Sequence, residues 1–346
     1  MTRHVLALTL GDPVGIGPEI TAKTLAEQAG AAEHHGIAVG DPIALRKGVE
    51  AMGLDVEVRV VDSFDVEPAG AGVIDIFDTG VLGDDMPEWG KVDERAGRAA
   101  IASIEVATQA AMDRKVDGIV TGPINKEAIW AAGSEHLGHT EMLGELTGVT
   151  QQDTMFVVRN DKAGGHHLRI FFTTRHVSLR KALDQLTKDR IEASIHKAHT
   201  ALEVFGVEKP RLAVAALNPH GGENGAFGDE EIVHITPACD AVRAEGLDVY
   251  GPIPADSVFH QGLVGRYDGV LSQFHDQGHI PAKTFDFDGT ISVTVGLPIL
   301  RTSVDHGTAF DIAGTGKAGH GTMLSAYLAA VDYAPYVDNI RKTYGS

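Results

Sequence analysis

The stretch that decides the fold runs from Asp268 to Gly316, with the sequence DGVLSQFHDQGHIPAKTFDFDGTISVTVGLPILRTSVDHGTAFDIAGTG. Its first apolar run, residues 269–272, predicts a buried strand, and His275-Asp276-Gln277 follow almost at once. Further polar side chains then stand between apolar segments: Lys283, Ser292, Arg301 and Asp305-His306-Gly307. Unpaired charge is costly at buried strand ends, so this pattern predicts either an ion-pair network or a ligand site.

Strands and helices alternate along the rest of the chain. A helical apolar pattern covers residues 94–112, and a strand over 116–121 leads into another helix. Such alternation implies a mostly parallel sheet with helices on both faces, and ligands then lie beyond the carboxyl ends of the strands. Thr121, Asn125 and Lys126 lie at such an end, although Asn125 also suits a helix cap.

Length and composition predict the number of domains and exclude several classes of partner and site. A chain of 346 residues predicts two domains. The net charge of −19 argues against nucleic acid and anionic membranes as partners, because both require clustered cations. The single cysteine excludes a disulfide within the chain and a thiolate zinc finger. No apolar run approaches the roughly 20 residues of a membrane span, and no signal-peptide pattern is visible, so we expect a cytoplasmic protein.

The turn after the first expected strand, GDPVGIGPE at residues 11–19, resembles a dinucleotide-binding loop only in part. The third glycine of that fingerprint is due at position 20, where the chain has Ile20. The pattern therefore favours a tight strand-to-helix turn, although a helix N-terminus there could still face a ligand.

Three histidines follow three expected strands: His176, His220 and His275. Imidazoles that converge from rigid elements are typical ligands of a borderline divalent cation, so the pattern predicts a metal site. Asp256 and Asp276 could orient these rings or join the ligand shell.

Two other segments leave alternatives open. His139 and Thr140 fall in the first turn of an expected helix, which suits an anion-binding site as well as an ordinary N-terminal cap. Gly164-Gly165-His166-His167 resembles a metal-binding tract, but a solvated loop between two strands explains it better.

Seven motifs, in order along nearly the whole chain, resemble the 4-hydroxythreonine-4-phosphate dehydrogenase family of vitamin B6 (pyridoxine) biosynthesis and its threonate and erythronate 4-phosphate relatives. They are GDPVGIGPE, TGPINKEAI, GHTEML, LNPHGGE, PADSVF, FHDQGHIPAK and GLPILRTSVDHGTAFDIAGTG. The resemblance implies a two-domain α/β/α sandwich of the isocitrate and isopropylmalate dehydrogenase type, with an active-site cleft between the domains. We expect residues 1–131 plus 305–346 in one domain and residues 132–304 in the other.

The resemblance also implies the residues of the site. A divalent metal (zinc, magnesium, cobalt or manganese) is expected on His176, His220 and His275. Substrate binding is expected from His139, Thr140, Lys283, Ser292 and Arg301. NAD or NADP is expected on the loop that resembles the adenosine-binding loop of isocitrate dehydrogenases, with His306, Gly307, Thr308, Ala309, Ala313 and Gly314. Lys283, Asp276 and Asp256 are the expected catalytic residues, in a homodimer with the active site at the subunit interface.

One position departs from the vitamin B6 enzymes, which have an asparagine where this chain has Ser292. A hydroxyl cannot replace an amide's donor and acceptor at the same reach. This favours a 4-phospho-threonate or 4-phospho-erythronate substrate, oxidised and then decarboxylated, over 4-phospho-hydroxythreonine. Three alternatives remain: a dihydrodiol dehydrogenase of an aromatic acid, a metal-dependent hydrolase, and a sugar-phosphate sensor without activity.

Overall fold

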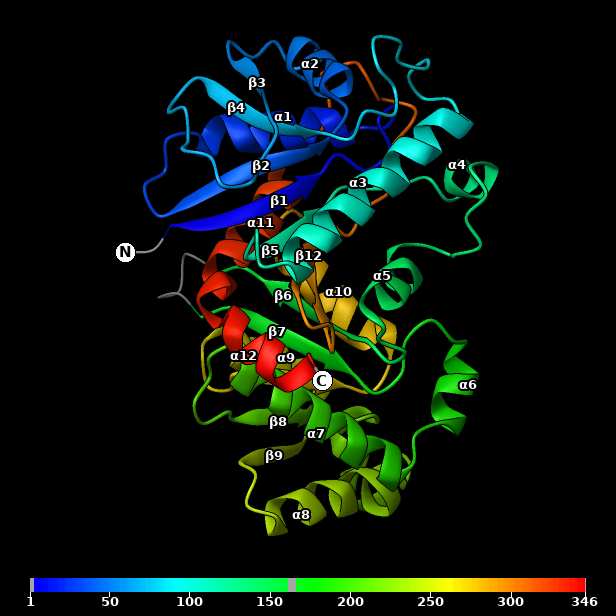
Figure 1. Ribbon diagram of the computed structural model, residues 1–346. Coiled ribbons are helices and arrows are strands. Elements are labelled where there is room, and N and C mark those ends of the chain that lie inside the picture. The colour runs from blue at the N-terminus through cyan, green and yellow to red at the C-terminus, as the bar shows by residue number, and fades with distance from the viewer. Residues whose placement is uncertain (1–2, 161–165, 346) are drawn as a thin grey trace. The chain divides into compact units, whose positions relative to one another are not determined.

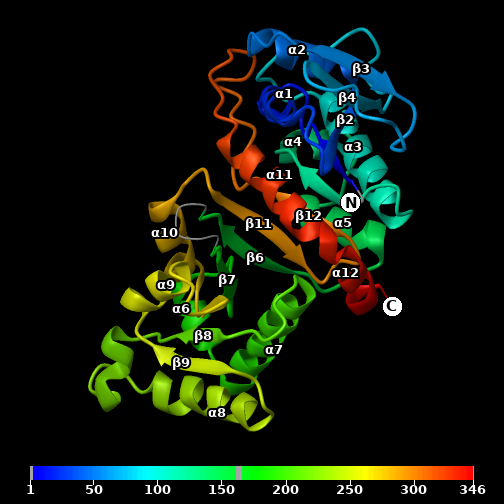
Figure 2. The same ribbon diagram turned by 90° about the vertical axis from the view of Figure 1, so that its left-hand side faces the viewer.

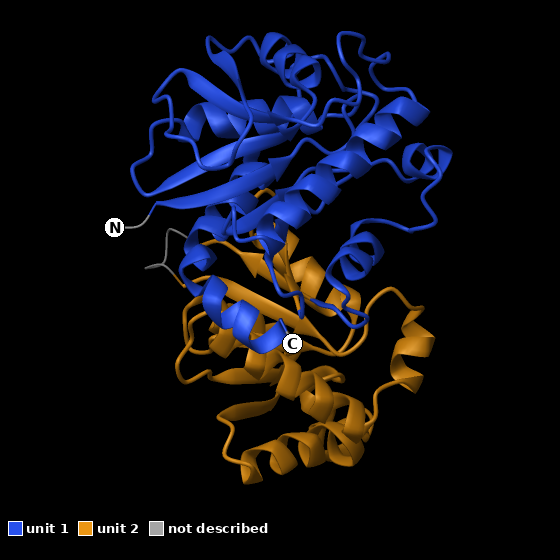
Figure 3. Ribbon diagram, viewed as in Figure 1, with its two compact units in different colours: residues 1–153, 296–346 blue, residues 154–295 orange. Residues whose placement is uncertain are grey.

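The computed structural model describes residues 3–160 and 166–345. The chain forms two compact units: unit 1 comprises Met1–Asp153 and Gly296–Ser346, and unit 2 comprises Thr154–Val295 (Figure 3). Gly164 and Gly165, part of the expected loop between two strands, lie outside the described residues.

Unit 1 is built on parallel strands in the order β3-β4-β2-β1-β5-β12. They are β1 (His4–Thr9), β2 (His34–Gly40), β3 (Glu57–Val61), β4 (Val73–Asp78), β5 (Gly118–Thr121) and β12 (Leu300–Ser303). The parallel sheet that the sequence predicted is therefore confirmed in this unit. The sequence did not predict β12, which pairs with β5 along its whole length.

Helices cover both faces of the unit 1 sheet, with α1 and α11 on one side and α3 on the other (Figure 2). The helices are α1 (Gly17–Gln28), α2 (Pro42–Ala51), α3 (Glu94–Met112), α4 (Lys126–Ala131), α5 (His139–Thr147), α11 (Gly321–Tyr333) and α12 (Val337–Tyr344). Met142 and Leu143 of α5 pack into the same apolar core as Ile104 of α3. This packing and the β12–β5 pairing place in unit 1 two elements that the expected boundaries assigned to the second domain.

The turn between β1 and α1 is held by close backbone packing. A side chain at Gly17 would lie 1.9 Å from the carbonyl oxygen of Leu10, so only glycine fits there. The buried Glu19 carboxylate accepts hydrogen bonds from the backbone N–H groups of Gly314 (2.9 Å) and Gly316 (2.7 Å). The first turn of α1 therefore anchors the loop that precedes α11.

Asp12 lies in the same turn and is fully buried. Its Oδ1 accepts the Val14 N–H at 3.0 Å, while its Oδ2 has no hydrogen-bond partner in the described part of the chain. Burial raises the pKa of the Asp12 carboxyl from 3.8 to about 6. The folded state therefore binds the proton more tightly than the unfolded state, and the cost of the buried charge disappears as the pH falls from 6 to 3.8.

We expect Asp12→Asn to remove the pH-dependent contribution of the Asp12 charge to the unfolding free energy, because asparagine keeps an acceptor for Val14 but does not titrate. The difference in unfolding free energy between variant and wild type should shift by roughly 2 kcal/mol between pH 7 and pH 4, in favour of wild type at low pH. Urea denaturation at several pH values measures it. A difference that does not vary with pH contradicts the prediction.

The described strands of unit 2 lie in the order β11-β6-β7-β10-β8-β9. They are β6 (Asp153–Val158), β7 (Leu168–Phe172), β8 (Leu212–Ala215), β9 (Val249–Ile253), β10 (Gly269–Ser272) and β11 (Thr290–Val295). Strands β7, β10, β8 and β9 run parallel, while β6 and β7 are antiparallel neighbours. The three strands that precede the predicted metal-ligating histidines are thus adjacent, in the order β7-β10-β8.

Helices also lie on both sides of the unit 2 strands, with α7 on one side and α9 and α10 on the other (Figures 1 and 2). They are α6 (Leu179–Asp184), α7 (Lys188–Val204), α8 (Thr236–Ala244), α9 (Ala255–Leu263) and α10 (His275–Phe285). Val258 and Phe259 of α9 and Ala282 of α10 pack on Ile170 and Val270 of the sheet. Among the described residues, no helix is both long and apolar enough to cross a bilayer.

Candidate functional site

Unit 1 contains a buried arginine close to Thr121 and His139. Arg301 lies on β12 and is 7% exposed. Its Nε and Nη2 both donate to the hydroxyl of Thr121 at the end of β5, at 3.1 and 2.8 Å. Thr121 in turn donates to Ser303 Oγ at 3.0 Å, which fixes the direction of its lone pairs. Burial lowers the pKa of Arg301 to about 10, so the guanidinium remains charged at neutral pH.

His139 opens helix α5 close to this guanidinium. Its Nε2 is buried and has no hydrogen-bond partner among the residues that the structure describes. Burial and then the charge of Arg301 lower the pKa of His139 well below its ordinary value, so the ring is neutral. A buried ring nitrogen without a partner is costly, and a ligand that bonded to it would remove that cost.

Other residues near the start of α5 have separate roles. The side chain of Lys126 approaches Gly138, directly before the helix: its Cε lies 4.0 Å from the position of a Cβ there. Thr140 is exposed, and its carbonyl accepts from Gln152 Nε2 at 2.6 Å. Asn125 caps α4 through a 3.0 Å bond from the Ala128 N–H, which confirms the cap reading. Arg301, His139, Lys126 and the α5 N-terminus together suit an anionic group.

In unit 2, His275 is the first residue of α10 and is held by its neighbours. Its Nδ1 lies 2.6 Å from Asp276 Oδ1. An ionised carboxylate only accepts, so Nδ1 carries the proton and Nε2 keeps its lone pair for a ligand. The His279 ring stacks on His275 at 3.6 Å between centroids, with 7° between the planes. The sequence did not assign His279 to the site, because the helix that places it one turn after His275 was not expected.

The His176 ring lies 5.8 Å from that of His275, so the structure brings two of the three predicted ligands together. His220 occupies a turn of left-handed residues after β8, with its ring 6.4 Å from Phe227. Within residues 3–160 and 166–345, no three His, Cys, Asp or Glu side chains are grouped closely enough to hold a metal ion. The pair His176 and His275 has the right chemistry for a divalent cation, but one chain does not gather the expected triad.

The other predicted residues of unit 2 lie on three different elements. Lys283 lies on α10, with its Nζ 5.4 Å from the centre of the Phe287 ring. Asp256 is exposed in the first turn of α9. Ser292 is half-buried in the middle of β11. The expected substrate residues therefore belong to both units, with His139, Thr140 and Arg301 in unit 1 and Lys283 and Ser292 in unit 2.

The expected cofactor loop, residues 305–316, packs on the β1–α1 turn. The Ile16 N–H donates to the Thr308 carbonyl at 3.0 Å, and a side chain at Gly15 would collide with Thr308. Gly314 has a φ of +76° and lies against Trp89, where any side chain would clash. The glycines at both ends of this contact are thus explained by packing and do not by themselves indicate a pyrophosphate site.

The family model described as pyridoxal phosphate biosynthetic protein PdxA matches residues 32–330. The chain belongs to the PdxA family. It is 56% identical over 342 residues to a Cutibacterium acnes protein provisionally named D-threonate 4-phosphate dehydrogenase, covering 98% of this chain and 96% of that protein. The family resemblance seen in the motifs is therefore confirmed.

Solved structures extend the match from sequence to fold. A 4-hydroxythreonine-4-phosphate dehydrogenase of Klebsiella pneumoniae superposes with a TM-score of 0.86 at 42% identity, over 96% of this chain and 98% of the other. A terephthalate 1,2-cis-dihydrodiol dehydrogenase of Burkholderia xenovorans gives a TM-score of 0.64 at 29% identity, over 96% and 98%. The α/β fold expected from the sequence is shared with these solved structures.

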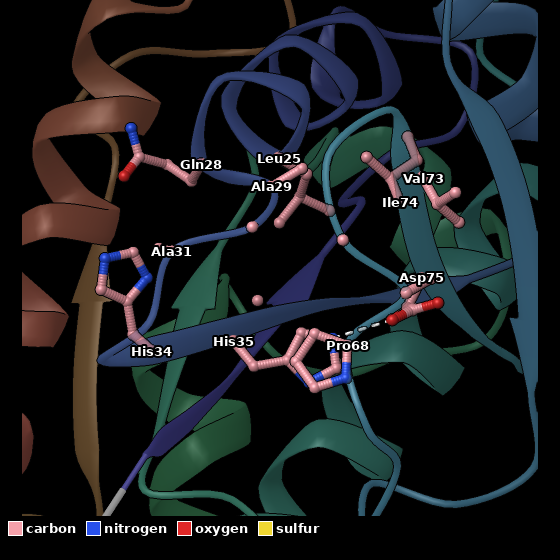
Figure 4. A pocket seen from close by; sticks show the side chains of 14 residues that line it. Leu25, Gln28, Ala29, Ala31, His34, His35, Pro68, Val73, Ile74 and Asp75 are labelled. Carbon is pink, nitrogen blue, oxygen red and sulfur yellow. Dashed lines mark hydrogen bonds and ion pairs between the residues drawn. The ribbon is translucent and has the colours of Figure 1, made fainter. Parts of the chain in front are cut away.

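One enclosed pocket of unit 1 lies away from these residues, at the amino ends of β2 and β4 (Figure 4). His35 there contacts the buried Asp75 at 2.8 Å, and Arg59 binds the same carboxylate. The cavity volume is ≈ 20 Å³, room for a single water molecule. The pocket is too small for a substrate of the PdxA family, and its ion pairs serve the fold.

Proposed function

We propose that this chain is an NAD- or NADP-dependent dehydrogenase that oxidises a 4-phosphorylated hydroxy acid and then decarboxylates it, using a divalent cation. The observation that carries the proposal is the buried Arg301 beside the neutral His139 and the N-terminus of α5. A guanidinium with a fixed plane binds a phosphate or carboxylate through two parallel N–H groups. We therefore place a phosphate or carboxylate of the substrate against Arg301 and His139.

The names of the relatives and one residue indicate which phosphorylated acid is the substrate. The relative that is 56% identical is named for D-threonate 4-phosphate. Ser292 stands where the resemblance to the vitamin B6 enzymes calls for asparagine, and its short hydroxyl suits a substrate with a different polar group at that point. We therefore assign 4-phospho-threonate or 4-phospho-erythronate as the substrate in preference to 4-phospho-hydroxythreonine.

Each hydride and proton transfer of the proposed reaction has a donor and an acceptor. When bound, the divalent cation supplies charge for the oxyanion that develops, and the nicotinamide supplies the hydride acceptor. Lys283 takes the proton of the hydroxyl β to the carboxylate as the hydride leaves the same carbon, which gives a β-keto acid. CO2 then leaves, and Lys283 donates a proton to the carbon that had carried the carboxylate. A four-carbon acid thus yields a three-carbon phosphorylated hydroxyketone.

His176, His220 and His275 would hold the cation, which we take as zinc, magnesium, cobalt or manganese. The bond between Asp276 and His275 favours an orienting role for Asp276, and proton transfer then falls to Lys283. Asp256, exposed at the start of α9, is the other carboxylate that we place near the reaction.

We further propose a cytoplasmic homodimer that completes the metal site at its interface. One chain brings His176 near His275 without assembling three ligands from its described residues. Apolar side chains are exposed on and beside α10, including Ile280 (62%) and Phe287 (62%). A second copy that covered this surface would bury those side chains and could bring in the missing imidazole.

The test is a metal-supplemented panel of 4-phospho-threonate, 4-phospho-erythronate and 4-phospho-hydroxythreonine, followed by NADH or NADPH absorbance and CO2 release. We expect reduced nicotinamide and CO2 in equal amounts, fastest with one of the first two acids. No nicotinamide reduction with any of the three overturns the proposal. Phosphate release without nicotinamide would identify a hydrolase instead.

A second candidate is a dehydrogenase of an aromatic cis-dihydrodiol acid, because the Burkholderia xenovorans relative bears that name. Such a substrate has no phosphate. Adding terephthalate cis-dihydrodiol to the panel distinguishes the two, since only this candidate predicts faster turnover of the unphosphorylated compound.

A further inference from the structure

Gln273 lies directly after β10 and is fully buried, yet it carries an amide. Its Oε1 accepts the hydroxyl of Thr173, which follows β7, at 3.1 Å. Its Nε2 donates to the carbonyl of Ala215, the last residue of β8, at 2.8 Å. One side chain thus ties together the ends of three adjacent strands.

Gln277, on the first turns of α10, doubles this connection. Its Oε1 accepts the backbone N–H of Gln273 at 2.7 Å, and its Nε2 donates to the carbonyl of Ala216 at 2.7 Å. The hydroxyl of Thr174 donates to the Gln273 carbonyl at 2.8 Å. We call Gln273 and Gln277 the amide clamp.

The joined strand ends are those that lead to the three histidines. Thr174 precedes His176 by two residues, Gln273 precedes His275 by two, and Ala216 precedes His220 by four. The strands are already paired through their backbones, so the clamp is not needed to form the sheet. Buried amides are costly unless fully bonded, and such networks fix one geometry.

The segment that carries His220 has an additional anchor. His220, Glu223 and Asn224 all adopt positive φ, which is unfavourable by roughly 1–2 kcal/mol for each such residue. The buried Glu231 carboxylate holds the start of this turn, accepting the N–H groups of Leu217 and Asn218, both at 2.7 Å. Strain of this kind persists only where the surroundings enforce it.

We propose that Gln273 and Gln277 are positioning residues for cation binding: they hold the loops that present His176 and His275 to one site, and they fix the start of the loop that presents His220 to the site shared with the partner subunit. The inference rests on the proposed function, because it assigns the clamp to that metal site. Neither glutamine contacts substrate or cofactor in this role. They act through the histidines, as outer groups do around other protein-bound metals.

The experiment uses the full-length protein with Gln277→Met and Gln277→Glu. Methionine removes both bonds, whereas glutamate keeps the acceptor for Gln273 N–H and loses only the donor to Ala216. Cobalt(II) binding is measured by calorimetry and by the visible spectrum of the bound ion. We expect Gln277→Met to weaken cobalt binding by about tenfold or more and to change the spectrum, with Gln277→Glu intermediate. The KM for NAD should stay unchanged while kcat falls.

Gln109→Met is the matched control, since Gln109 is exposed on α3 and its amide makes one 2.8 Å bond to Asp113. It should bind cobalt as wild type does. Cobalt affinity and spectrum unchanged in both Gln277 variants overturn the inference alone. Absence of cobalt binding and turnover in wild type overturns the proposed function, and the inference with it. If Gln277→Met fails to fold, Gln277→Glu and Gln273→Glu decide, because each removes one donor and keeps the acceptor.

Discussion

Arg301→Lys is expected to lower kcat/KM for the phosphorylated acid by about 100- to 1000-fold, or roughly 3–4 kcal/mol of transition-state stabilisation. Thr121 accepts from two nitrogens of the guanidinium and fixes its plane. Lysine keeps the positive charge but offers no planar fork for an anion, and its ammonium cannot make both bonds to Thr121. Steady-state kinetics on the preferred acid measure the loss.

Two further variants separate this loss from an effect on the fold. Arg59→Lys breaks a comparable two-bond contact, with Asp75 on β4, and should lower the unfolding free energy while leaving kcat/KM unchanged. Thr121→Val keeps the shape of the side chain but removes the hydroxyl, so it should lower kcat/KM in the same direction as Arg301→Lys and by less. Wild-type kinetics in Arg301→Lys would remove Arg301 from substrate binding.

The position of Arg301 also shows where the sequence stopped being informative. Alternating apolar and helical patterns predicted the strands and helices of unit 1 up to α5. They did not predict β12, a four-residue strand with a charge in its middle. A buried arginine breaks the apolar pattern of a central strand, and it bonds to Thr121, which lies 180 residues away in the sequence. Such a partner cannot be inferred from local periodicity.

The same division holds in unit 2. The sequence predicted that His176, His220 and His275 each follow a strand of one sheet, and the structure adds that these strands, β7, β8 and β10, are neighbours. Helix α10 was not predicted, because Gly278 and Pro281 lower its helix propensity. The left-handed turn at His220 depends on contacts with Glu231, and neither could be read from composition or spacing.

His275→Ala is expected to reduce metal-dependent turnover at least 1000-fold, about 4 kcal/mol, while the fold survives. The His275 side chain is 40% exposed, so its removal leaves little cavity. His220→Ala should have the same effect, since its side chain is exposed too. Circular dichroism and the melting temperature check the fold, and turnover with added metal checks the activity. Wild-type turnover in His220→Ala would remove His220 from the metal site.

Mixing the two inactive variants decides how the site is assembled. In a dimer of one His275→Ala chain and one His220→Ala chain, a site shared between subunits is intact once: His176 and His275 of the second chain meet His220 of the first. Random re-association of equal amounts should then restore about a quarter of wild-type activity, because half of the dimers are mixed and each has one good site. A site built within a single chain would regain nothing, since each chain lacks one of its imidazoles. Recovery is favoured because the described residues of one chain contain no group of three possible metal ligands, although His176 and His275 lie near each other.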